Sequence, residues 1–83
     1  MSRLYHPAPS IEVTTDERGQ PVALTWRGSL YRGTVRGHWR IRTAWWEGEE
    51  IHRDYYLLEA EDLICEVYQD KRLGDWRLHR IYD

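Results

Sequence analysis

The chain has 83 residues, which excludes a second domain, because a domain of this size buries only about 60 to 65% of its unfolded surface. Five Trp and six Tyr, with no Phe, must therefore supply much of the core. One cysteine excludes an internal disulfide, and no apolar run reaches the ~20 residues of a membrane span or resembles a signal peptide, so we expect a cytoplasmic protein without membrane association.

The net charge of −2 is unevenly distributed along the chain. Residues 1–46 carry a net charge of +4, whereas residues 47–83 carry −6. Such asymmetry is typical of a polyanion-binding face, and it also arises when basic strands pair with acidic ones inside one domain. Both interpretations remain open from the sequence.

The first elements in chain order are a flexible arm and a hairpin. Residues 1–9, with two prolines, predict a flexible N-terminal arm, and residues 10–83 a single β domain. The segment 10–15 alternates apolar and polar residues, and 16–20 has turn composition. A second strand over 22–26 completes the hairpin, and a tight turn at 27–29 leads into a third strand.

The third strand, from Leu30 to Arg42, has a two-residue period. Its apolar members are Tyr31, Val35, Trp39 and Ile41, and its polar members are Arg32, Thr34, Arg36, His38, Arg40 and Arg42. Because side chains alternate between the faces of a strand, this pattern predicts an apolar row in the core and an arginine row in solvent. Gly33 and Gly37 predict a bend or bulge, with one long strand serving two sheets.

The rest of the chain predicts a loop over 45–50 and strands over 51–60, 63–70 and 76–82. A helical period fits only 55–68, where Asp62 interrupts the apolar stripe. In the last strand, alternation puts Arg80 on the face of Trp76 and Leu78, and Ile81 on the opposite face. About six short strands with Gly-containing turns predict an all-β antiparallel meander or barrel of SH3-like or OB-like size.

Two features are candidate binding elements. The arginine row (Arg32, Arg36, Arg40 and Arg42) has a spacing that suits phosphates, or it is a solvated face paired with carboxylates on neighbouring strands. Trp45 and Trp46 are adjacent and cannot both enter one core from an extended chain. The exposed one would stack a base or anchor a protein, or the two would cover the end of the barrel.

Catalytic and metal-binding signals are weak in this sequence. An enzyme would need His52, Asp54 and His79 to converge, and nothing in their spacing requires it. The histidines lack the paired spacing of a zinc site, and there is no glycine-rich phosphate loop. We therefore expect a non-enzymatic protein without a metal or cofactor, with Cys65 as a small buried residue.

Aromatic signatures carry two resemblances over residues 22–82. Trp-Arg-Gly-x-x-Tyr at 26–31, Trp45-Trp46 and Gly74-Asp75-Trp76-Arg77-Leu78 together resemble a small uncharacterised bacterial domain family. The part from Trp45-Trp46 through Arg53-Asp54-Tyr55-Tyr56 to Trp76-Arg77-Leu78-His79 also resembles the C-terminal segment of ImuB-type proteins, the inactive Y-family polymerase relatives of the bacterial mutasome. The second resemblance implies a role beside translesion DNA synthesis, through contact with a polymerase, a clamp or DNA.

These observations favour an interaction module that binds a protein or nucleic acid through the arginine row and one of the two tryptophans. The alternative hypothesis is a structural or self-association domain, in which the basic and acidic surfaces of two copies meet in a homo-oligomer.

Overall fold

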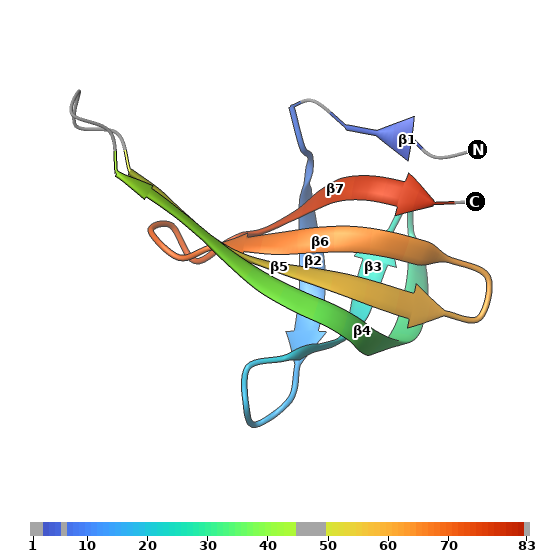
Figure 1. Cartoon of the computed structure of the whole chain (residues 1–83). Coiled ribbons are helices and arrows are strands. Elements are labelled where there is room, and N and C mark those ends of the chain that lie inside the picture. The colour runs from blue at the N-terminus through green and yellow to red at the C-terminus, as the bar shows by residue number, and fades with distance from the viewer. Residues whose placement is uncertain (1–2, 6, 45–49, 83) are drawn as a thin grey trace.

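The computed structural model describes residues 3–5, 7–44 and 50–82, and these residues form strands and turns without a helix. The strands are β1 (Arg3–Leu4), β2 (Ser10–Thr15), β3 (Pro21–Trp26), β4 (Ser29–Ala44), β5 (Glu50–Ala60), β6 (Ile64–Asp70) and β7 (Trp76–Tyr82). Their order is β1-β7-β2-β3-β4-β5-β6, and β6 also pairs with β7 (Figure 1). Strands β2 to β7 thus close into a six-stranded antiparallel barrel, which confirms the predicted fold class.

The buried apolar cluster of the barrel comes from four of its strands, β3, β5, β6 and β7. Its buried cluster consists of Leu24, Tyr56, Leu58, Cys65, Val67, Trp76 and Leu78. Leu58, Val67 and Leu78 are at most 1% exposed. The predicted burial of Cys65 is confirmed, and burial raises the pKa of its thiol to about 12, so the thiol stays protonated and unreactive at neutral pH.

The sequence explains two of the turns. In one turn the residues adopt a left-handed backbone, and in the other a side chain accepts hydrogen bonds from nearby backbone groups. Arg27 and Gly28, with φ of 52° and 82°, form the two-residue connection from β3 to β4, as in a type I′ hairpin. In the turn from β2 to β3, the Asp16 carboxylate accepts hydrogen bonds from the backbone N–H groups of Arg18 and Gln20, each at 2.9 Å.

Strand β4 is long because it belongs to two parts of the barrel. Its first residues, Ser29–Arg32, pair with β3, and from Gly33 onward it pairs with β5. A Cβ at Gly33 would lie 3.2 Å from the carbonyl oxygen of Glu59, so glycine permits this close approach of the two backbones. The predicted use of one long strand on two sides of the fold is confirmed.

Strand β7 contains a bulge that corrects the prediction for its faces. Leu78 lies opposite Val67, but Arg80 lies opposite Glu66, so His79 is an additional residue on the β7 side. Beyond this bulge the alternation is reversed, and Ile81 rather than Arg80 packs against the core. The sequence prediction was wrong here because it carried one period through the whole strand.

Residues expected in the flexible N-terminal arm lie against β7 where the structure describes them. Leu4 pairs with Arg80, and the Tyr5 N–H donates to the His79 carbonyl oxygen at 2.9 Å. The Leu78 N–H donates to the Pro9 carbonyl oxygen at 3.0 Å. These bonds extend the barrel by the short strand β1. No helix in the described part of the chain is long and apolar enough to cross a membrane.

Candidate interaction surface

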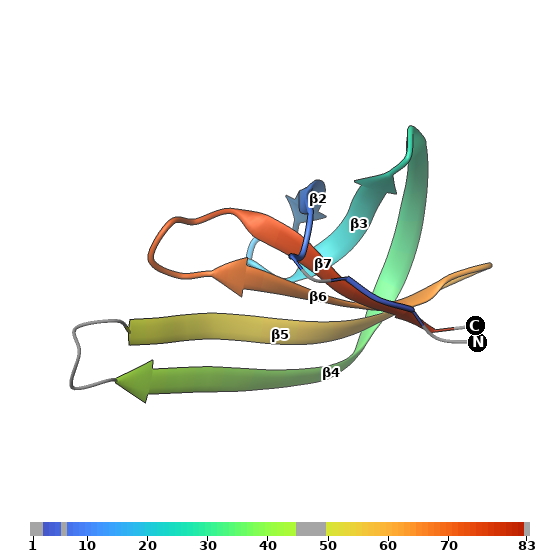
Figure 2. The ribbon, with the colours of Figure 1, turned by 90° about the horizontal axis from the view of Figure 1, so that it is seen from above.

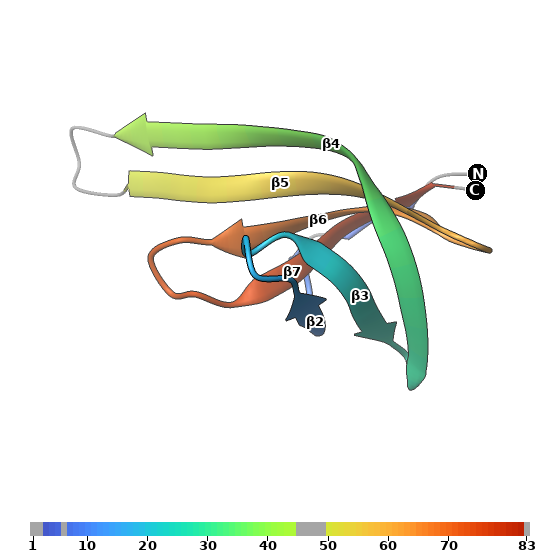
Figure 3. The ribbon, with the colours of Figure 1, turned by 90° about the horizontal axis from the view of Figure 1, so that it is seen from below.

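Strands β4 and β5 run on past the end of β6 as a two-stranded extension (Figures 2 and 3). We call residues 37–44 of β4 and 50–57 of β5 the projection; its inner part, from 53 to 57 of β5, still pairs with β6, and its outer part lies past the end of β6. The β5–β6 ladder begins at Arg53, so within the described chain the outer part of the projection is paired only between its own two strands. All five residues from His38 to Arg42 are exposed, which makes the projection the main candidate for contact with a partner.

A bulge in β4 sets which face of the projection each side chain occupies. Val35 lies opposite Leu58, whereas Gly37 lies opposite Leu57, so Arg36 is an additional residue that reverses the alternation. Tyr31 and Val35, before the bulge, pack against the core as predicted. Trp39 and Ile41, after it, do not enter the core and are each 39% exposed, so the prediction for them was wrong.

The inner face of the projection, which continues the barrel interior, holds a buried carboxylate among cations. Asp54 is 4% exposed, and its Oδ1 accepts a hydrogen bond from Arg40 Nε at 2.8 Å. Lys71 Nζ lies 3.6 Å from Oδ2, and His38 Nε2 lies 3.9 Å from Oδ1. Burial acts to raise the pKa of Asp54, but the hydrogen bond and charge of Arg40, with the charge of Lys71, outweigh it and hold the pKa below its ordinary value.

The outer face carries a row of aromatic rings with an arginine among them. Trp39 stacks on Tyr55 with 5.6 Å between ring centroids, and Tyr55 contacts Tyr68 at 5.0 Å. The Arg53 guanidinium lies 4.5 Å from the centroid of the Tyr68 ring and donates to the Tyr55 hydroxyl at 3.2 Å. Tyr55 and Tyr68 are buried, so Trp39 is the exposed end of a packed aromatic row.

The four predicted arginines do not form one row. Arg36 lies at the bulge and pairs with Glu59 at 3.0 Å, as the alternative interpretation of the row expected. Arg40 lies on the inner face with Asp54. Arg42 faces the same way, because it is two residues further along β4 and pairs with His52, which is two residues before Asp54 on β5. Arg32 lies before the bulge, at the other end of the strand. The bulge therefore divides the predicted row, since each extra residue moves all later side chains to the opposite face.

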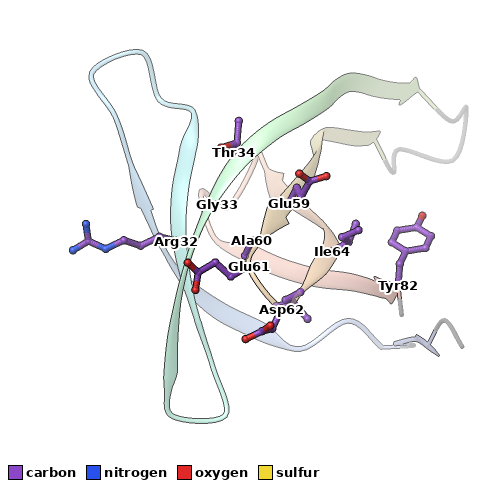
Figure 4. Close-up of a pocket in the computed structure, with 10 residues that line it drawn as sticks. Arg32, Gly33, Thr34, Glu59, Ala60, Glu61, Asp62, Ile64 and Tyr82 are labelled. Atoms are coloured by element: carbon purple, nitrogen blue, oxygen red, sulfur yellow. The ribbon is translucent and has the colours of Figure 1, made fainter.

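Arg32 borders an open pocket of about 700 Å³ at the turn from β5 to β6. In Figure 4 its side chain extends away from the other labelled residues, and the carboxylates of Glu59, Glu61 and Asp62 belong to this region. The described residues contain no group of three or more His, Cys, Asp or Glu placed to hold a metal ion. The carboxylates around this pocket repel an anion, which disfavours a phosphate beside Arg32.

The residues that an enzyme would need lie on opposite faces of the sheet. Asp54 is on the inner face, whereas His79 is on the outer face, where its ring contacts Tyr55 at 5.5 Å. His79 Nδ1 lies 2.7 Å from Glu66 Oε2. Trp45 and Trp46 lie outside the described residues, so their predicted role stays a prediction.

Sequence reasoning missed Trp39, Ile41 and Asp54 as surface-determining residues. The available signal was Gly37, because a glycine inside a strand pattern marks a bulge, and a bulge at this point exposes Trp39 and Ile41. Asp54 had no such signal, since its neighbours Arg40, His38 and Lys71 come from β4 and from the turn after β6.

Comparison of the chain with protein-family models, with curated proteins and with solved structures finds no match. The two family resemblances therefore stay predictions that depend on the quoted aromatic motifs.

Proposed function

We propose that this chain is a non-enzymatic interaction module that binds a protein partner through the projection. The observation that carries the proposal is the exposure of Trp39 and Ile41, which alternate along the outer face of β4 where this strand has left β3 and pairs with β5. When a partner covers large apolar side chains at such a position, their removal from water lowers the free energy of the complex.

The composition of the outer face supports a protein partner. Trp and Arg are among the residues that most often dominate the binding energy of protein interfaces, and Trp39 and Arg53 both lie on this face, where each contacts the buried Tyr55. Their packing against each other restricts their rotamers before binding. Less conformational entropy would then be lost when a partner docks.

A nucleic acid is the second candidate partner, and the Trp39 ring favours it. A base could stack on this ring, with Arg53 nearby as a cation. Against it, Arg36 and Arg40 are paired with carboxylates, which reduces the positive field available to phosphates. The resemblance to ImuB-type proteins is compatible with either partner and supports a role as an accessory of a polymerase in translesion synthesis or DNA repair.

The proposal is tested by crosslinking from the projection in cells of the source organism. A photoreactive p-benzoylphenylalanine replaces Ile41 in one protein and Val22 of β3 in another, because Val22 is 38% exposed and so is a matched control. We expect a protein crosslink from position 41 that is absent from position 22 and is lost with Trp39→Ala. Identical crosslinks from both positions would contradict the proposal.

The nucleic-acid candidate is tested with the purified protein. Fluorescence anisotropy of labelled single-stranded and duplex DNA is recorded at two salt concentrations, with Trp emission followed in parallel. Binding that weakens steeply with salt and quenches Trp emission, and that Trp39→Ala removes, would make a nucleic acid the partner. If the anisotropy does not depend on the salt concentration, a nucleic acid is excluded and a protein remains the candidate partner.

A further inference from the structure

One edge of the projection has backbone groups that the fold does not use. From Gly33 onward β4 pairs with β5 on one side, and among the described residues no strand pairs with it on the other side. Figure 3 shows β4 at the outer edge, diverging from β3. Alternate N–H and C=O groups of β4 between Gly37 and Ile41 thus point away from β5 and can pair with another extended chain.

We propose that this edge binds an extended segment of a protein partner by β-strand addition, and that the segment alternates acidic and apolar residues. This inference rests on the proposed function and specifies the partner's chemistry. Five residues of β4 span about 17 Å, which matches a short strand. Backbone hydrogen bonds would provide affinity, and the alternating side chains would provide specificity.

The required alternation follows from the two faces of β4. A residue of the added strand lies opposite a β4 residue on the same face, with Cβ atoms about 4.5 to 5.5 Å apart. On the outer face it would meet Trp39 and Ile41, which favour apolar partners. On the inner face it would meet His38 and Arg40. Arg40 bonds Asp54 through Nε, yet its side chain is 62% exposed, so it can still attract a carboxylate.

The same pattern opposes a second copy of this chain as the occupant. If two β4 edges paired in antiparallel fashion with matching faces, the His38 and Arg40 side chains of both copies would share one face. Like charges directly opposite each other destabilise a pair of strands, and a shift by one residue would place charged side chains against Trp39 and Ile41. Cationic residues on an open edge are a common protection against self-pairing.

The test uses the full chain, labelled with ¹⁵N, and a synthetic peptide that alternates Glu and Val. Amide hydrogen exchange is followed by NMR for residues 37–41. We expect alternate amides of this segment to exchange slowly only when peptide is present. At a peptide concentration about ten times the dissociation constant, their exchange should slow about tenfold.

Three control peptides separate the parts of the proposal. A peptide N-methylated at alternate amides keeps its side chains but loses the hydrogen bonds of one edge, and it should give no protection. A peptide with its Glu and Val residues in two blocks, and one that alternates Lys and Val, should bind more weakly. Arg40→Gln should reduce the preference for Glu over Lys.

Several results would overturn the inference. These are absence of protection at millimolar peptide, equal binding of the N-methylated peptide, and protection that depends on protein concentration without peptide. The last result would make a second copy the occupant. If the crosslink from position 41 requires Trp39 but the peptide gives no protection, the proposed function stands and strand addition fails. If neither is observed, both fail.

Discussion

The barrel and the projection share strands β4 and β5, yet they are held together in different ways. In the barrel, Leu58 and Val67 are 1% and 0% exposed, and their neighbours are apolar. In the projection, Trp39 and Ile41 are 39% exposed. Burial in the core therefore explains why the side chains of the barrel are apolar. It does not explain why Trp39 and Ile41 of the projection are apolar, because these side chains stay partly exposed.

Polar contacts join the two regions. Asp54 on β5 lies between Arg40 on β4 and Lys71 in the turn after β6, so the carboxylate links the projection to the β6–β7 end of the barrel. The Lys71 N–H also donates to the His52 carbonyl oxygen at 2.9 Å. These contacts tie the turn after β6 to the projection and do not involve Trp39 or Ile41.

The largest expected difference between the two regions is in the cost of truncating an apolar side chain. Leu78→Ala should lower the free energy of unfolding by about 2 to 5 kcal/mol, because it removes buried methyl groups and leaves a cavity. Ile41→Ala should change it by less than about 1 kcal/mol, since this side chain keeps contact with water. Urea unfolding followed by Trp emission measures both values.

Similar costs for the two truncations would mean that the projection is part of the cooperative core. Val22→Ala is the control for Ile41→Ala, because the two residues are almost equally exposed on different strands. A large effect at position 41 but not at position 22 would show that the outer face is structural, and would weaken the proposed function.

A smaller effect is expected at the junction. Asp54→Asn should lower the free energy of unfolding by about 1 to 2 kcal/mol at neutral pH, because it removes the negative charge with which both Arg40 and Lys71 pair. The folded pKa of Asp54 is lower than its unfolded value of 3.8, so this contribution is fully present above pH 3.8 and is lost as the pH falls through the folded pKa. Urea titrations between neutral and strongly acidic pH should show the two proteins converging in acid.

A difference that stays constant down to the lowest pH would show that the Asp54 charge does not stabilise the junction. Asp16→Asn is a matched control in the exposed β2–β3 turn, where the carboxylate accepts local backbone hydrogen bonds.

The sequence predicted the elements well and the faces less well. Strand bounds and turns follow from local signals, such as the alternation in 10–15 and the glycine at position 28. The faces of β4 and β7 depend on bulges at Arg36 and His79, and each additional residue reverses every later side chain. A bulge near Gly37 was predicted and is confirmed, but its effect on the faces beyond it was not predicted. Alternation is therefore a reliable guide only as far as the next bulge.

The candidate site could be predicted only in part for the same reason. Three of the candidate arginines, Arg36, Arg40 and Arg42, lie on or beside the projection, and their role in binding stays a prediction. The residues exposed on its outer face were not predicted, since their exposure depends on the bulge. The partner of Arg40 was also missed, because Asp54 is on the neighbouring strand and its burial is a tertiary property.

Gly28, in the turn between β3 and β4, and Gly37, inside β4, offer a third and more local comparison. Gly28→Ala should lower the free energy of unfolding by about 1 to 2 kcal/mol, since φ is +82° there and the cost is backbone strain with no steric clash. Gly37→Ala should be nearly neutral, because its added Cβ would meet Leu57 at an ordinary contact distance of 3.7 Å. Thermal unfolding of both variants measures the difference, and equal costs would contradict this account of the two positions.

The smallest effect is expected from the ion pair at the bulge. Arg36 and Glu59 are 57% and 46% exposed, so a double-mutant cycle of Arg36→Ala and Glu59→Ala should give a coupling energy below about 1 kcal/mol that decreases with salt. The bulge itself should persist in all three variants, because it arises from the number of residues between Val35 and Gly37 and not from the charge on one of them. NMR contacts between Trp39 and Tyr55 report this directly. Their loss in Arg36→Ala would mean that the ion pair, and not the strand register, holds Trp39 on the outer face.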